Sequence, residues 1–347
     1  MKDVLTSDKD SKDYFSISII VITFNEEENI RDCLDSLVKL DYPEDKYEIV
    51  IVDSSTDSTP RIVESYKNVK LVRSEKGFSQ QKNVAIKSAA FEILAFTDAD
   101  CIVSRDWLKI INQAFKNKKI AAIGGNGYPP PGTGYFGKCV AYVGHPAGGA
   151  IGFDANVTRT ENGVDFIPGC NSVYRRKVLL DVGGFDPFFT QGGEDVDISR
   201  RMKQKGYFID YIPELTVYHK PRDTLLGYIR WNIHVGITKF NIKRPSLLKL
   251  IFQPSFPLWS ILLFFGFLFL LKIPALFISS LFFLWILSII FLLVMAKPYA
   301  LLIKRRRKIG VNLLSISTVI PFLIYTRQIC INIGQIKKWL HVKRRVP

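Results

Sequence analysis

The sequence predicts an α/β protein built on a doubly wound, mostly parallel sheet that is flanked by helices and followed by C-terminal transmembrane helices. Two observations indicate the sheet. Apolar, β-rich segments alternate with amphipathic segments in the first third of the chain, and several of the apolar segments end in polar side chains. A third observation indicates the membrane part, because two long apolar runs without any charge lie beyond residue 254.

The first strand is predicted over residues 16–23 and stops at Phe24 and Asn25. Asn25 is expected to cap a helix that runs to about Leu40, because the three glutamates that follow it would lie in the first helical turn. Further strands are predicted over residues 47–52, 69–72, 93–97 and 121–123, with helices ending near residue 66 and spanning residues 79–90 and 105–116. This alternation indicates parallel strands joined by helical crossovers.

The strand over residues 93–97 runs directly into two carboxylates, Asp98 and Asp100. Open α/β sheets bind ligands at the carboxyl ends of their parallel strands. Carboxylate oxygens at such an edge suit Mg²⁺ or Mn²⁺ that carries a diphosphate. Because Asp-x-Asp is a common sequence, a solvated loop after the strand is the alternative interpretation.

Two other predicted strands also end in polar side chains, namely Thr23 with Asn25, and Asp53. In a parallel sheet these ends share one edge, so their side chains can converge on a single ligand. Neither a Gly-x-Gly-x-x-Gly turn nor a Gly-Lys-Ser/Thr loop is present in the sequence. The charge of a diphosphate is therefore expected to be met by the metal ion and by cations such as Lys76 or Lys82.

The net charge of +15 is unevenly distributed, since residues 220–347 hold 20 Lys and Arg but a single acid, Asp223. These basic residues flank apolar runs instead of forming a polar stripe, which argues against nucleic-acid binding. The five cysteines show no C-x-x-C spacing. That pattern argues against a zinc site or a disulfide framework and fits a reducing compartment.

The apolar runs over residues 256–271 and 273–296 would span roughly 24 and 36 Å as helices, which brackets the thickness of about 30 Å of a bilayer core. We expect a transmembrane hairpin, with a buried hairpin in a globular fold as the alternative. Basic residues flank both outer ends, so the positive-inside rule predicts a multi-pass protein of the cell membrane with its N-terminal domain in the cytoplasm. Residues 313–325 are expected to form an interfacial or re-entrant helix that contacts membrane lipids, with a third span as the weaker option.

The front part of the chain resembles the family 2 glycosyltransferases over about residues 16–225. The likeness rests on ordered motifs at residues 23–27, 51–57, 97–100, 169–176, 182–186 and 193–197. It implies a GT-A fold, a nucleotide-sugar donor, a divalent metal ion and inversion at the anomeric carbon. The domains expected are a disordered lead (1–15), the GT-A catalytic domain (16–225), a juxtamembrane helical linker (226–254), the transmembrane hairpin (255–296) and a basic cytoplasmic or interfacial segment (297–347).

The resemblance also implies roles for single residues. Asp195 matches the catalytic base, although ordinary helix capping is the alternative from spacing alone. Asp100 matches the metal ligand, Asp98 the acid near ribose and metal, and His219 a histidine that completes the metal shell in several relatives. The remaining expectations are donor contacts from Thr23, Asn25, Glu26, Asp53, Lys76, Lys82 and Asp98, and acceptor contacts from Gly169, Asn171 and Glu194. Lys82 stands where the family usually has arginine.

These inferences predict a membrane-anchored inverting glycosyltransferase that moves a sugar from a UDP- or GDP-linked donor to an acceptor hydroxyl. The expected acceptor is a lipid-linked or membrane-associated glycan. One alternative is a membrane nucleotidyltransferase or a metal-dependent phosphohydrolase, and another is a catalytically inactive membrane scaffold. The sequence leaves the sugar, the nucleotide base and the acceptor open.

Overall fold

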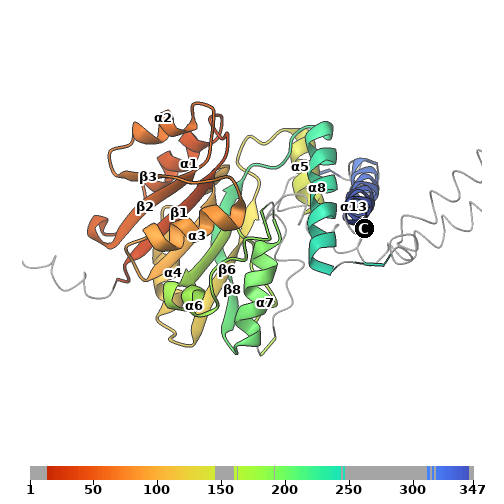
Figure 1. Cartoon of the computed structure of the whole chain (residues 1–347). Helices are drawn as coiled ribbons and strands as arrows, with labels where there is room; N and C mark the ends of the chain where they lie inside the picture. The colour runs from red at the N-terminus through yellow and green to blue at the C-terminus, as the bar shows by residue number, and fades with distance from the viewer. Residues whose placement is uncertain are drawn as a thin grey trace, which may run out of the picture. The chain divides into compact units, whose positions relative to one another are not determined.

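The computed structural model describes residues 14–144, 160–161, 163–190, 192–243, 245–246, 311–312, 315 and 318–343 (Figure 1). The chain divides into two compact units. The first comprises residues up to Thr133 together with Gly144–Pro221, and the second comprises Gly134–Val143 together with the chain from Arg222 onward.

The first unit contains an eight-stranded sheet in the order β3-β2-β1-β4-β7-β6-β8-β5. Its strands are β1 (Ile17–Thr23), β2 (Tyr47–Asp53), β3 (Val69–Arg73), β4 (Ile93–Asp98), β5 (Cys101–Val103), β6 (Ile120–Tyr128), β7 (Asn171–Arg175) and β8 (Phe208–His219). The strands β3, β2, β1 and β4 pair with one another in parallel, as predicted. The other half is mixed, because β6 is parallel to β8 while β7 is antiparallel to both β4 and β6, and β5 is antiparallel to β8.

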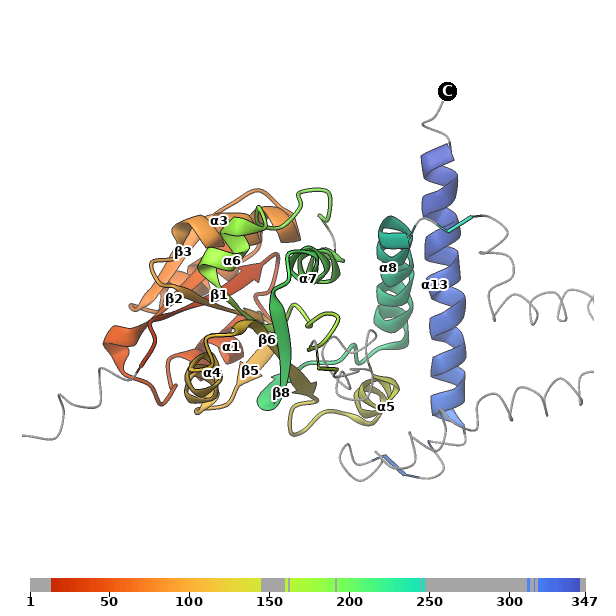
Figure 2. The same cartoon turned by 90° about the horizontal axis from the view of Figure 1, so that it is seen from below.

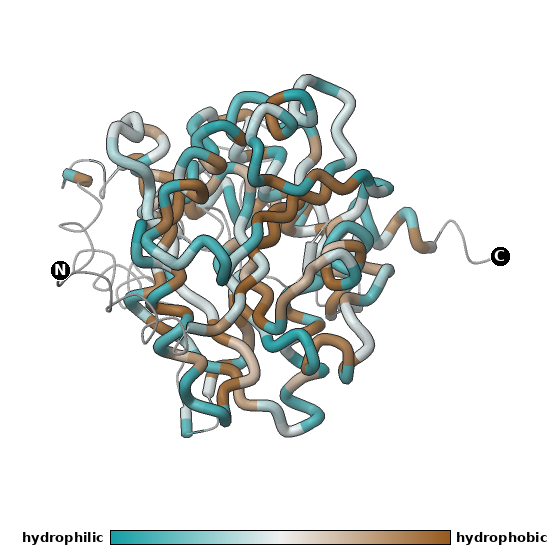
Figure 3. Tube along the Cα trace, turned by 90° about the vertical axis from the view of Figure 1, so that its left-hand side faces the viewer, coloured by the Kyte–Doolittle hydropathy of each residue, from teal (hydrophilic) through white to brown (hydrophobic). Residues whose placement is uncertain are grey.

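Helices cover both faces of this sheet, as Figure 2 shows. One apolar cluster joins the sheet to α1 (Ile30–Leu37) and α4 (Trp107–Phe115). A second cluster on the other face joins it to α3 (Phe78–Ser88), α6 (Arg176–Asp181) and α7 (Glu194–Gln204). The short helix α2 (Thr59–Glu64) and a 3-10 turn (Glu44–Lys46) complete the connections around β2. Figure 3 shows apolar stretches along the trace interrupted by hydrophilic turns, which is the alternation that the sequence displays.

The predicted start of the first helix is wrong. Asn25 has a left-handed backbone with φ of 56°, and α1 begins only at Ile30. Asparagine tolerates this conformation better than most residues. Its side-chain oxygen accepts a hydrogen bond from the backbone N–H of Thr56 at 2.9 Å, so Asn25 joins the ends of β1 and β2 instead of capping a helix.

In the second unit, α5 (Tyr135–Val143) and α8 (Leu225–Lys243) accompany the long helix α13 (Val319–Lys343). A glycine on each of the two long helices permits close contact. A Cβ at Gly236 would lie 2.1 Å from the carbonyl oxygen of Ile331, and one at Gly334 would lie 2.0 Å from that of Ile233. The hydroxyl of Tyr228 adds a hydrogen bond of 2.9 Å to the carbonyl of Leu323.

The two apolar runs predicted to form a transmembrane hairpin, and the predicted lead over residues 1–13, lie outside the described residues. Within the part of the chain that the structure describes, no helix combines the length and the apolar character needed to cross a membrane. This finding overturns the predicted multi-pass location in the cell membrane and the cytoplasmic placement that was inferred from it.

Candidate functional site

The pairing of β5 with β8 creates the acidic centre of the site. Its register places Cys101 opposite His219, next to the acidic pair at the end of β4. Nε2 of His219 therefore lies 3.1 Å from Oδ1 of Asp100. Potential ligand atoms of Asp98, Asp100 and His219 all lie within 4.8 Å of one another. The three residues expected to hold a metal ion are thus brought together from two distant parts of the sequence.

This donor set fits the expected divalent ion. Two carboxylates and one imidazole suit Mn²⁺, whereas Mg²⁺ is less typically bound by imidazole. Burial, with the nearby Cys170 and Asp100, raises the pKa of Asp98 well above its usual value. Although burial lowers the pKa of His219, the Asp100 carboxylate and Cys170 raise it well above its usual value. Two carboxylates that lie this close together repel each other when both are ionised, and a bound cation would relieve this repulsion.

At the neighbouring strand ends, Thr23 and Asp53 face each other across β1 and β2. The Thr23 hydroxyl donates to Asp53 Oδ1 at 2.6 Å, and the backbone N–H of Ser55 donates to the same oxygen at 3.1 Å. Arg73 forms an ion pair with the other carboxylate oxygen, Oδ2. Asp53 is fully buried. The structure therefore joins two of the predicted nucleoside-binding residues through a direct hydrogen bond.

Other predicted donor contacts have different surroundings. Glu26 accepts a hydrogen bond from the side chain of Asn29 at 2.8 Å. The exposed Lys76 places its ammonium 3.3 Å above the centre of the Phe24 ring. Lys82 is buried and forms an ion pair with Glu194, with Nζ 2.6 Å from Oε1. Lys82 is thus engaged by a carboxylate that was predicted to bind the acceptor.

Asp195 lies at the start of α7, which follows Gly193 with its left-handed φ of 93°. Its carboxylate accepts a hydrogen bond from the backbone N–H of Val196 at 2.8 Å and another from that of Gly169 at 3.3 Å. Burial and the adjacent Glu194 carboxylate raise the pKa of Asp195 to about 6, although Lys82 partly opposes the shift. A carboxylate with this pKa is a stronger base than an ordinary aspartate and is still ionised at neutral pH.

Residues 169 and 170 connect the metal donors with Asp195. The backbone of Gly169 donates to Asp195, and the thiol of the next residue, Cys170, lies within 4.8 Å of His219 and Cys101. A Cβ at position 169 would lie 3.1 Å from Lys82 Nζ, so this glycine also borders the buried ion pair. The predicted base and the predicted metal donors consequently flank the same short loop.

Asn171 does not join this group through its side chain. The side chain is fully buried, and its amide donates to the carbonyls of Asn126 and Leu215 at 3.2 and 2.8 Å. Its oxygen accepts from Nε1 of Trp107 at 3.2 Å. The amide therefore ties β7 to β6, β8 and α4, and the predicted acceptor contact has no support from its position.

We expect Asn171→Ala to lower the free energy of unfolding by about 1–3 kcal/mol, because buried carbonyls lose their donor. Urea denaturation measures this change. Metal-dependent nucleotide affinity should stay at its wild-type value when measured on the folded fraction. An unchanged midpoint together with lost ligand affinity would instead identify Asn171 as a ligand-binding residue.

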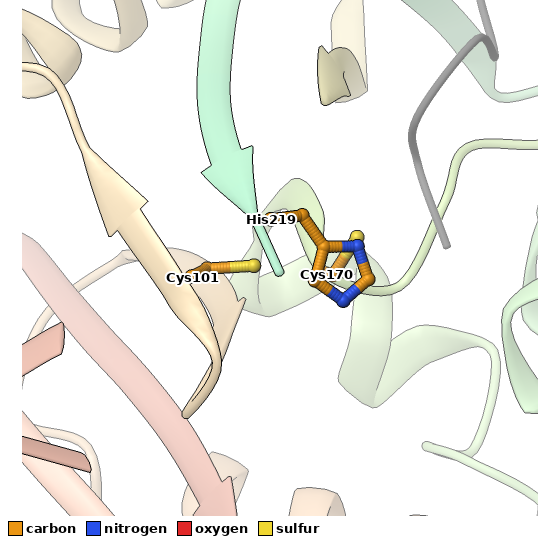
Figure 4. Close-up of side chains that lie close together, drawn as sticks. All are labelled: Cys101, Cys170 and His219. Atoms are coloured by element: carbon orange, nitrogen blue, oxygen red, sulfur yellow. The ribbon is translucent and has the colours of Figure 1, made fainter. Parts of the chain in front are cut away.

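Sequence reasoning missed one cluster, which consists of Cys101, Cys170 and His219 (Figure 4). The two cysteines are far apart in the chain and lack the short spacing of known cysteine motifs. Only the register of β5 against β8 and the position of the loop before β7 bring them together. The sequence contains no local signal from which this cluster could be predicted.

Residues 18–183 match the protein family described as "Glycosyl transferase family 2". The chain is 28% identical over 216 residues to the Glycosyltransferase AglE of Haloferax volcanii. The aligned residues cover 59% of this chain and 67% of that protein. It is also 28% identical over 227 residues to a poly-β-1,6-N-acetyl-D-glucosamine synthase of Staphylococcus epidermidis, which covers 62% of this chain and 53% of that protein. The chain therefore spans about half the length of this synthase.

A solved structure is similar to the chain over most of its length. It is described as the mannosyltransferase PcManGT from Pyrobaculum calidifontis in complex with GDP-Man and Mn²⁺. The TM-score is 0.54 at 21% identity, with 93% of this chain and 87% of that chain covered. This likeness concerns the fold, and with the family match it confirms the predicted GT-A-like α/β class for the sheet.

Proposed function

We propose, from the match of residues 18–183 to the family described as "Glycosyl transferase family 2", that the chain transfers a sugar from a nucleotide-sugar to an acceptor hydroxyl with inversion. The observation that supports this most directly is the loop at Gly169 and Cys170. This loop contacts the proposed base, Asp195, on one side and approaches the acidic centre at His219 on the other.

Asp98, Asp100 and His219 would hold Mn²⁺ or Mg²⁺. When bound, the ion would supply positive charge to the donor's diphosphate and so stabilise the leaving nucleotide. The chain's own residues at the neighbouring strand ends, Thr23 and Asp53, would orient the nucleoside. The proposed donor is a UDP- or GDP-linked sugar.

Asp195 is the proposed general base. It would remove the proton from the acceptor hydroxyl while that oxygen forms a bond to C1 of the sugar, and the bond from C1 to the diphosphate oxygen breaks on the opposite face. The nucleoside diphosphate leaves with the electron pair, so an α-linked donor gives a β-linked product. The raised pKa of Asp195, caused by burial and by Glu194, supports this role.

Glu194 is proposed to contact the acceptor. One of its oxygens accepts from Lys82 at 2.6 Å, which balances the buried charge. Its other oxygen, Oε2, is buried and receives no hydrogen bond from any residue that the structure describes. A buried carboxylate oxygen without a donor favours a ligand hydroxyl at that position.

We further propose a lipid-linked or otherwise membrane-associated glycan as the acceptor. The second unit supports this idea, because its helices expose large apolar side chains to solvent. These include Leu225, Leu226, Phe322, Ile336 and Leu340. Exposed apolar side chains gathered in one unit favour contact with an amphiphilic partner.

Thermal unfolding in the presence of UDP- and GDP-sugars, with and without Mn²⁺, tests donor binding. A ligand that binds only the folded state raises the unfolding temperature. We expect one nucleotide class to stabilise the chain, and only when Mn²⁺ is present. No stabilisation by any donor in the panel would contradict the proposal.

The pH dependence of transfer provides a further prediction. With a pKa of about 6, Asp195 is protonated at low pH and gains its basic form as the pH rises. At saturating donor and Mn²⁺, the transfer rate at pH 5 should be about tenfold lower than at pH 7, and it should level off above pH 7. A rate that stays constant between pH 5 and pH 7 would exclude a base with this pKa.

A further inference from the structure

The thiols of Cys101 and Cys170 have no role in the proposed glycosyl transfer, although they lie beside His219, one of the proposed metal ligands. We propose that the cluster of Cys101, Cys170 and His219 forms a Zn²⁺ site which shares His219 with the carboxylate metal centre, so that the two sites exclude each other. The site itself rests on geometry alone, and its effect on catalysis rests on the proposed function.

The three side chains come from different parts of the first unit. Cys101 opens β5, Cys170 precedes β7 and His219 ends β8. They are 0%, 5% and 6% exposed, and one ligand atom from each lies within 4.8 Å of the other two (Figure 4). Neither cysteine is in a disulfide. Two buried thiols and one buried imidazole are thus positioned together without a covalent link.

The imidazole of His219 presents a different nitrogen to each donor set. Nε2 lies 3.1 Å from Asp100. Nδ1 is buried on the side of the ring that does not contact Asp100, and the thiol of Cys170 is the neighbouring group that interacts with the ring there. Figure 4 shows the sulfur of Cys170 next to a ring nitrogen of His219. Nδ1 is therefore the atom left to complete a site with the two thiols.

This arrangement matches the usual environment of a zinc-binding histidine. Such a histidine binds the metal through one nitrogen and donates its other N–H to a carboxylate, which fixes the ring. Here Asp100 would accept from Nε2–H while Nδ1 binds the ion. Thiolate sulfurs favour Zn²⁺ over Mg²⁺ or Mn²⁺, and three protein ligands leave one of four tetrahedral positions open. On binding, each thiol releases one proton to solvent.

The same arrangement explains why both sites cannot be complete at once. A ring nitrogen that carries a proton has no lone pair for a metal ion. With Zn²⁺ on Nδ1 and a proton on Nε2, His219 is lost as a ligand for Mn²⁺ at Asp98 and Asp100. Zn²⁺ should consequently weaken Mn²⁺ binding and inhibit transfer.

Titration of the full chain with Co²⁺ tests the site, because thiolate ligands give Co²⁺ an intense near-ultraviolet charge-transfer band. We expect one band-forming equivalent per chain, displaced by Zn²⁺. The band should disappear in Cys101→Ser and in Cys170→Ser. It should persist in Cys330→Ser, a matched control that alters a buried cysteine of the second unit. A band of full intensity in both site variants, or no band in the wild type, would overturn the proposal.

Electron paramagnetic resonance of Mn²⁺ tests the exclusion without any need for activity. One equivalent of Zn²⁺ should lower Mn²⁺ affinity by about 10–100-fold in the wild type. It should have no such effect in the Cys101→Ser, Cys170→Ser double variant, whose own Mn²⁺ binding shows that it is folded. Wild-type chains that bind Zn²⁺ and Mn²⁺ together would refute the exclusion. A cobalt band in a chain that never transfers sugar would refute only the proposed function.

Discussion

Asp195→Asn should lower the rate of transfer by about 10²–10⁴-fold, the usual contribution of general-base catalysis. Asparagine keeps the size of the side chain but cannot accept the proton of the attacking hydroxyl. The proposed nucleoside contacts, Thr23 and Asp53, lie at the ends of β1 and β2, whereas Asp195 lies at the start of α7, so the affinity for UDP or GDP should remain close to that of the wild type. Steady-state kinetics and calorimetric titration of the nucleotide measure the two effects separately.

Asp197 on the same helix provides the matched control for Asp195. Asp197 is buried, and its carboxylate forms ion pairs with Arg200 and Arg201 at 2.9 and 2.7 Å. Its charge is therefore balanced by arginines of the same helix. Asp197→Asn should lower stability but leave kcat/KM of the folded protein unchanged. Wild-type transfer by Asp195→Asn, or equal losses in both variants, would remove Asp195 as the base.

Asp100→Ala should abolish Mn²⁺-dependent nucleotide binding and, with it, nearly all transfer. Asp100 lies in direct contact with Nε2 of His219, so its removal deletes one of the three proposed metal donors at the centre of the cluster. Titrations of Mn²⁺ by electron paramagnetic resonance, followed by nucleotide titrations at fixed Mn²⁺, measure this loss.

The control for this variant is Glu64→Ala, which removes an exposed acid from α2. It should bind Mn²⁺ and nucleotide as the wild type does. Chelation of the wild-type protein should mimic Asp100→Ala, and added Mn²⁺ should restore transfer only to the wild type. Nucleotide binding by Asp100→Ala that still responds to Mn²⁺ would place the ion elsewhere.

The features that sequence could predict are local. The strands β1 to β4 follow from continuous apolar runs, and their parallel pairing follows from the helices between them. Asp98 and Asp100 could be placed at the ligand-binding edge because a strand ends there. Asp195 and His219 needed the family resemblance, since a lone helix-start acid or a lone histidine has many ordinary explanations.

The features that sequence could not predict depend on distant contacts. The short strand β5 exists only because it pairs with β8, and this pairing brings Cys101 to His219. The sequence predicts Lys82 as a phosphate-binding cation, but in the structure its ammonium lies 2.6 Å from the carboxylate of Glu194. Asn171 lies in a motif that suggests ligand contact, yet its amide is bonded to carbonyls of two other strands and to a tryptophan. In each case the partner comes from a remote segment.

Phosphorus NMR of the chain incubated with GDP-mannose or UDP-GlcNAc and Mn²⁺ tests the central claim most directly. If the acidic centre and Asp195 serve sugar transfer, the phosphorus product should be the nucleoside diphosphate, formed in the same amount as the sugar that is released or transferred. The claim would be contradicted if the products were nucleoside monophosphate together with pyrophosphate or sugar phosphate. It would also be contradicted if the nucleotide-sugar bound to the chain but was never consumed.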